Sequence, residues 1–206
     1  MQIHKGIKYT IFAEGNSVRK SDGVTEVTMP YYPERDASAL AGEIDELTAW
    51  RILHDVAEQA QGSDTPVEPE HIMIDGAGFI LNPFSRSLDA KFTAPEGYEA
   101  VWALGASVFY IFLGCHVFQG LGGKGETPTA PIPTLRRELP ELSGLIAACL
   151  AYDPKRRPSL QRIVEVADYN LVRCGRNVME FPPKKRNYET GISSDDLDYG
   201  WPEEMD

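Results

Sequence analysis

An apolar run from Val101 to Cys115 is the feature that most constrains how this chain can fold. The run contains no charged residue, and it is shorter than the roughly 20 residues that a transmembrane helix needs. A helix that is apolar on all sides must be covered on all sides by other parts of the protein. The sequence therefore predicts a buried helix over 98–114 and no membrane-spanning segment.

Three further helices are predicted around this one. Apolar residues recur at every third or fourth position over 45–60, and Asp45 is placed to cap the first turn. Similar patterns predict helices over 142–151 and 160–169, the second opened by Ser159 as its cap.

Strands are predicted in two places. Alternating apolar and polar residues over 7–12 and 24–30 predict a small antiparallel sheet, with the turn signal Asp22-Gly23 between them. A second, shorter hairpin is predicted over 71–81. The predicted fold class is therefore α+β and mainly α-helical.

Charge is unevenly distributed along the 206 residues. The chain has 31 Asp and Glu against 20 Lys and Arg, and seven of the acids lie in the last twenty residues, which contain no base. Such a chain lacks the basic face that binds nucleic acid, so no nucleic-acid partner is expected. Three widely spaced cysteines and an N-terminus without a signal-peptide pattern predict a cytoplasmic protein.

Three motifs between residues 94 and 159 follow one another in a characteristic order. They are Ala94-Pro95-Glu96, the run Val101-Trp102-Ala103-Leu104-Gly105, and the DPxxRPS signature at Asp153–Ser159. Together with Glu46–Ala60 and Pro69–Ser85, they resemble the C-terminal lobe of the eukaryotic-type protein kinase fold. The resemblance covers roughly Val24 to Tyr169.

This resemblance implies that the chain has three parts. Residues 1–33 would form a vestigial small β N-lobe and the hinge, residues 34–172 a kinase-like C-lobe, and residues 173–206 an acidic tail that contains aromatic residues. It also implies a structural ion pair between Glu96 and Arg157, which would tie the Ala94-Pro95-Glu96 turn to the last helices.

The residues that transfer phosphate in kinases are missing from the matching positions. The resemblance puts Pro66 at the catalytic aspartate, Glu68 at the phosphate-contacting lysine and His71 at the metal-binding asparagine. The magnesium-binding motif reads Pro83-Phe84-Ser85. A proline cannot accept the substrate proton, and a carboxylate at position 68 would repel the transferred phosphate. We therefore expect no catalytic residue, no cofactor and no metal.

A glycine-rich stretch, Gly120–Gly125, spells GxGxxG. It follows a predicted helix and runs into prolines, whereas a phosphate-binding loop follows a strand and opens a helix. The stretch is therefore predicted to be a loop rather than a phosphate site.

The sequence as a whole predicts a catalytically inactive kinase-like protein, a pseudokinase, that binds another protein as a scaffold, allosteric regulator or inhibitor. One alternative is an atypical nucleotide-dependent transferase that uses Glu68, His71 and Asp75 on a reduced kinase scaffold. Another is one subunit of an obligate complex whose partner completes the fold. The candidate partner-binding residues are the apolar ones set among the acids of the tail: Tyr188, Leu197, Tyr199 and Trp201.

Overall fold

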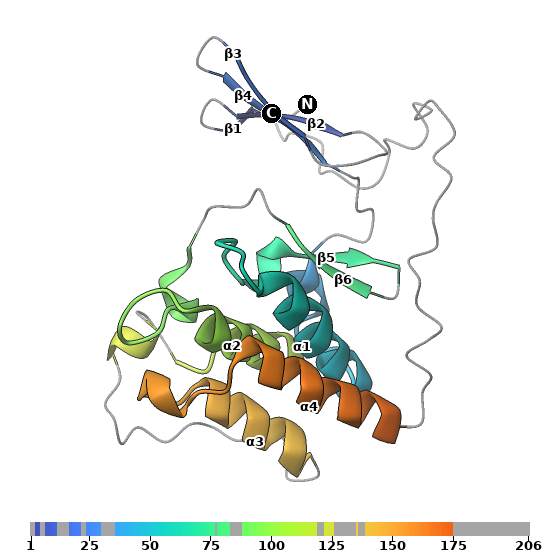
Figure 1. Cartoon of the computed structure of the whole chain (residues 1–206), viewed down its shortest axis with the longest axis vertical. Coiled ribbons are helices and arrows are strands. Elements are labelled where there is room, and N and C mark those ends of the chain that lie inside the picture. The colour runs from blue at the N-terminus through green and yellow to red at the C-terminus, as the bar shows by residue number, and fades with distance from the viewer. Residues whose placement is uncertain are drawn as a thin grey trace, which may run out of the picture. The chain divides into compact units, whose positions relative to one another are not determined.

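The structure of the chain is a computed structural model that divides into two compact units, with a boundary between Pro33 and Glu34 (Figure 1). In the first unit it describes the backbone of the strands only, which comprise residues 3–4, 7–11, 17–21 and 24–29. In the second unit it describes residues 36–76, 78–82, 88–118, 122–125, 135 and 139–174. The two units are described separately below.

The first unit contains a four-stranded sheet in the order β1-β2-β4-β3, where β1 is Ile3–His4, β2 is Ile7–Ile11, β3 is Ser17–Ser21 and β4 is Val24–Met29. The predicted antiparallel pairing of the segments over 7–12 and 24–30 is wrong, because β2 and β4 run parallel. The antiparallel neighbour of β4 is instead β3, the strand that precedes it along the chain.

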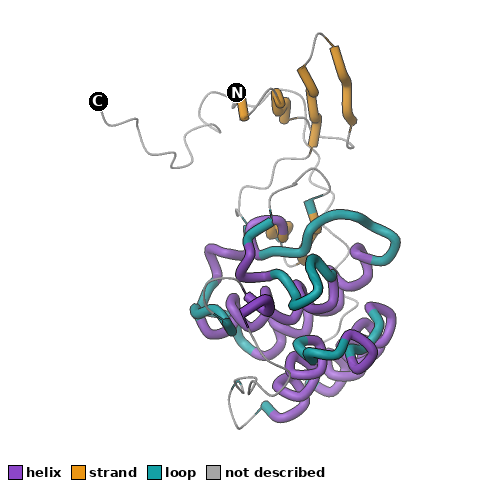
Figure 2. The backbone as a smooth tube through the Cα atoms, turned by 90° about the vertical axis from the view of Figure 1, so that its left-hand side faces the viewer, coloured by secondary structure: helices purple, strands orange, loops and turns teal. Residues whose placement is uncertain are grey.

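The second unit is built around helix α2 (Ala100–Leu113), as the apolar run predicts. Eleven of its fourteen residues are buried. It contacts both α1 (Glu46–Ala60) and α3 (Pro140–Cys149), and α1 packs along α4 (Leu160–Arg173). Figure 2 shows from a second direction that helices make up most of this unit. The predicted α+β, mainly helical class is confirmed.

The helix ends follow from local chemistry. The Asp45 carboxylate accepts the backbone N–H of Thr48 at 2.8 Å, and Ser159 Oγ accepts that of Arg162 at 3.1 Å, so each caps the start of a helix as predicted. Gly114 ends α2 with a φ of 71°, a left-handed conformation that favours glycine. No helix of the described residues is long and apolar enough to cross a membrane.

Strands β5 (Ile72–Asp75) and β6 (Gly78–Leu81) pair antiparallel, as predicted for the hairpin over 71–81, and β6 lies against α1. Two α1 side chains bind the outer edge of β6. Asp55 accepts the N–H of Phe79 at 3.0 Å, while Gln59 donates to the Phe79 carbonyl at 2.8 Å and accepts the N–H of Leu81 at 3.0 Å. These bonds satisfy backbone groups that a third strand would otherwise pair.

Candidate functional site

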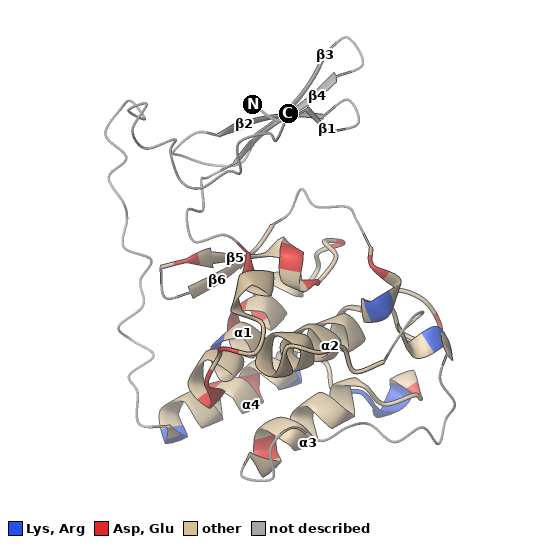
Figure 3. Ribbon diagram, turned by 180° about the vertical axis from the view of Figure 1, so that it is seen from behind, with Lys and Arg blue, Asp and Glu red and all other residues tan. Residues whose placement is uncertain are grey.

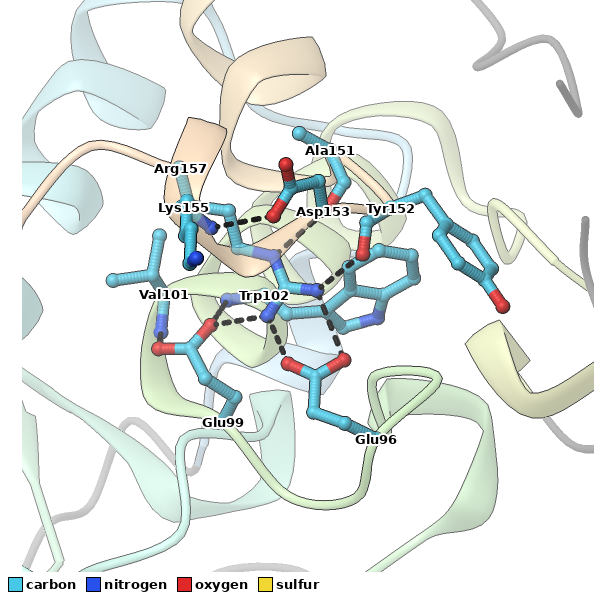
Figure 4. A network of polar contacts seen from close by, with 9 residues as sticks. All are labelled: Glu96, Glu99, Val101, Trp102, Ala151, Tyr152, Asp153, Lys155 and Arg157. Carbon is cyan, nitrogen blue, oxygen red and sulfur yellow. Dashed lines mark hydrogen bonds and ion pairs between the residues drawn. The ribbon is translucent and has the colours of Figure 1, made fainter. Parts of the chain in front are cut away.

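Arg157 is the centre of a polar network that joins three segments of the second unit (Figure 4). Its side chain is only 2% exposed, and it forms ion pairs with Glu96 and with Glu99, the latter at 3.1 Å. Its Nε donates to the Ala151 carbonyl at 2.8 Å. The guanidinium also lies 5.0 Å from the ring centroid of Trp102, within range of a cation–π interaction. The structure thus joins Glu96 and Arg157, the two residues that the kinase resemblance pairs.

Glu99 is a second member of this network that the resemblance did not assign. Its carboxylate accepts the N–H groups of Val101 at 2.9 Å and Trp102 at 2.8 Å, so it caps the first turn of α2 while it pairs with Arg157. The hydrogen bond from Arg157 holds the pKa of Glu96 below its ordinary value. Both carboxylates are therefore used in holding helices together.

Glu68 and His71, which the kinase resemblance places at the phosphate-contacting lysine and the metal-binding asparagine, lie side by side in the structure. Glu68 is 3% exposed and His71 is 2% exposed, and 3.9 Å separates Glu68 Oε2 from His71 Nε2. Glu68 Oε1 accepts the backbone N–H of Asp89 at 2.7 Å. The pair therefore lies inside the fold, and one of its carboxylate oxygens is already engaged with the backbone.

The loop that carries this pair is fixed by neighbouring side chains. The Tyr98 hydroxyl donates to the Thr65 carbonyl at 3.2 Å and accepts the N–H of Val67 at 3.0 Å. Buried Ser107, on α2, donates to the Val67 carbonyl at 3.3 Å. Pro66, which the resemblance places at the catalytic aspartate, is itself buried, and its carbonyl lies 3.0 Å from His71 Nδ1. The loop is thus bound to the core from several sides.

Burial is the largest influence on the pKa values of both Glu68 and His71. It raises the pKa of Glu68 to about 7, although the hydrogen bond from Asp89 acts in the opposite direction. It also lowers the pKa of His71, so the imidazole is neutral near pH 7. A carboxyl group whose pKa lies near neutral pH beside a histidine has the proton affinity of a general acid or base. Its burial, however, keeps it from reaching a substrate.

We expect the Glu68→Gln variant to be more stable than the wild-type protein near and above neutral pH, and about equally stable at acidic pH. Folded Glu68 keeps its proton between its ordinary pKa of 4.5 and about 7, whereas the unfolded chain loses it, so wild-type stability falls as pH rises through that interval. Glutamine is uncharged, like protonated Glu68, so the variant does not lose stability as the pH rises. The variant should gain about 2 to 3 kcal/mol by pH 8 and little at pH 4.5.

Urea denaturation of both proteins from pH 4.5 to pH 8 measures this difference. Glu70→Gln is the matched control, because Glu70 is exposed two residues away and loses the same charge. Its stability difference from the wild type should stay within about 0.5 kcal/mol at every pH. A gain for Glu68→Gln that does not grow with pH would contradict the burial of an ionisable Glu68.

The glycine-rich stretch is packed against the protein. Residues Gly122–Gly125 form a 3-10 turn, η4, and the N–H of Gly123 donates to the Thr93 carbonyl at 2.9 Å. A Cβ on Gly123 would lie 2.6 Å from Pro95 Cδ and 2.7 Å from Trp102 Cζ2. The backbone of Gly123 therefore packs tightly against the segment that leads to Glu96. Sequence spacing alone gave no sign of this contact.

Several predicted site residues lie outside the described residues. They are the three residues that the resemblance aligns with the magnesium-binding motif of kinases and the four in the tail: Pro83, Phe84, Ser85, Tyr188, Leu197, Tyr199 and Trp201. Within the described part of the chain, no group of three or more His, Cys, Asp or Glu side chains is arranged to hold a metal ion.

Comparisons with known proteins add no family to this picture. No known protein family matches the sequence, and no curated protein is significantly similar to it.

Proposed function

We propose that this chain is a kinase-like protein that does not transfer phosphate and that functions by binding another protein, as a scaffold, allosteric regulator or inhibitor. The observation that carries the proposal is the burial of Glu68 and His71. Groups that contact ATP or its metal must reach the solvent-filled cleft, whereas these two side chains are 3% and 2% exposed. Their polar atoms instead face the protein interior and each other.

The network around Arg157 supports the same proposal. Glu96, Glu99 and Arg157 bind helix ends and backbone carbonyls to one another, and such contacts stabilise a helical unit whether or not it catalyses a reaction. A protein that has kept the packing of a fold and lost its reacting groups can still present a surface to a partner. Binding is therefore the function best matched to the residues that are present.

Phosphate transfer from labelled ATP tests this proposal. The full chain is incubated with ATP labelled at the γ-phosphate and with magnesium or manganese, alone and with a generic protein substrate. We expect no incorporation of label above the background without protein. Metal-dependent incorporation that disappears in the Glu68→Gln variant would contradict the proposal, because it would make Glu68 a reacting group.

One observation favours a second candidate, an atypical nucleotide-dependent transferase. Glu68 has a pKa of about 7 and lies 3.9 Å from a neutral histidine, a combination suited to proton transfer near neutral pH. For this activity the segment around Asp89 would have to move away from Glu68, since the N–H of Asp89 now occupies one carboxylate oxygen. Nucleotide binding separates the two candidates.

A further inference from the structure

Three short 3-10 turns converge on Trp102. They are η3 (Ala90–Phe92), η4 (Gly122–Gly125) and η5 (Pro154–Arg156). Gly122 of η4 lies against the backbone of η3, and Gly123 lies against the edge of the Trp102 ring. Arg157, which directly follows η5, covers the same ring at 5.0 Å. The turns lie together at one end of the helical unit in Figure 1, where they are green, yellow and orange.

Each of these turns contains one or two basic residues. Lys91 lies in η3, Lys124 lies in η4, and Lys155 and Arg156 lie in η5. Figure 3 shows blue ribbon on all three turns at the same end of the unit. The side chains of Lys124, Lys155 and Arg156 are exposed. We call these four residues the basic rim.

The acids near the basic rim are engaged in contacts within the protein. Glu96 and Glu99 pair with Arg157, and Asp89 pairs with Lys91 at 3.4 Å. Asp153 accepts the N–H of Lys155 at 3.0 Å and so caps η5. Among the described residues, by contrast, Lys124, Lys155 and Arg156 form no ion pair. Three exposed cations at this end are therefore available to a partner, although the whole chain has a net charge of -11.

We infer that the basic rim binds an acidic segment of a protein partner. Unpaired cations on an otherwise acidic protein would steer a negatively charged segment to this end and fix its orientation. Tyr152, which is 38% exposed and directly precedes the η5 cap, adds an exposed aromatic side chain to the segment that carries Lys155 and Arg156. This inference rests on the proposed protein-binding function and names the chemistry of the partner.

Fluorescence anisotropy with the full chain tests the inference. The probe is a short fluorescein-labelled peptide in which Glu alternates with Tyr. The double variant Lys155→Glu with Arg156→Glu, and separately Lys124→Glu, should each weaken binding of this peptide by about tenfold or more, because each replaces an attraction by a repulsion. Arg162→Glu on α4 is the matched control for Lys124→Glu, since it makes the same change in charge at an exposed site outside the rim.

The outcomes separate this inference from the proposed function. Weakening by the rim variants and not by Arg162→Glu supports it, provided that circular dichroism shows each variant folded. Equal weakening by Arg162→Glu, equal binding of a single-stranded oligonucleotide of the same charge, or no peptide binding at all would overturn it. None of these three results depends on phosphate transfer, so the proposed absence of that activity is tested separately.

Discussion

Replacing Arg157 by methionine is expected to lower the free energy of unfolding by about 3 kcal/mol, at the lower end of the range for a broken buried ion pair. The guanidinium is 2% exposed and binds two carboxylates and two backbone carbonyls. Methionine keeps much of the apolar contact with Trp102 but leaves these acceptors without their donor. The loss stays near the lower end because Glu96 and Glu99 are 39% and 32% exposed, so water can hydrate them.

Urea denaturation of the full chain measures this loss, with Arg162→Met as the control. Arg162 pairs with Glu165 at 2.9 Å, but both side chains are more than half exposed, and such pairs contribute about 0 to 1 kcal/mol. If both variants lost the same small amount of unfolding free energy, Arg157 would not be a main stabilising contact of the helical unit.

Replacing Gly122 by alanine is expected to cost about 2 to 4 kcal/mol, through overpacking and an unfavourable backbone conformation together. A Cβ at this position would lie 2.3 Å from the Ala90 carbonyl oxygen, which is backbone and cannot rotate away. The φ of Gly122 is also +60°, in the left-handed region that alanine rarely adopts. The η4 turn would have to move away from η3 to accept the methyl group.

Gly125→Ala is the matched control for this substitution. Gly125 ends the same turn, and a Cβ there would meet no atom within 4 Å. Its stability should change by no more than about 0.5 kcal/mol. If thermal denaturation showed the two variants equally stable, the tight packing of η4 against η3 would be refuted, and the convergence of the three basic turns would lose its support.

The helical core could be predicted from the sequence because its signals are local. The apolar run at Val101–Cys115 requires burial whatever surrounds it, and α2 is buried as that run predicts. Capping by Asp45 and Ser159 likewise depends on residues within one turn of the helix start. Such features can be predicted without knowing which distant segments pack together.

The features that sequence reasoning missed depend on contacts between distant segments. The parallel pairing of β2 with β4 cannot be read from alternation, because a strand pattern is the same for either direction of its neighbour. The position of Glu68 against the N–H of Asp89, 21 residues away, follows from tertiary packing. The same holds for Gly122 against Ala90, since nothing in a GxGxxG pattern names the backbone that it approaches.

The central proposal is that this chain resembles a protein kinase but has no working nucleotide site, and a thermal shift with nucleotide tests it most directly. A site with a Kd of about 0.1 mM would stabilise the folded protein by about 2.3 kcal/mol at about 5 mM ATP. That gain would raise the Tm of a domain of this size by about 5 °C or more. We predict no change in the Tm of the full chain when ATP is added with magnesium or manganese. A saturable rise in the Tm that requires the metal ion would contradict the claim.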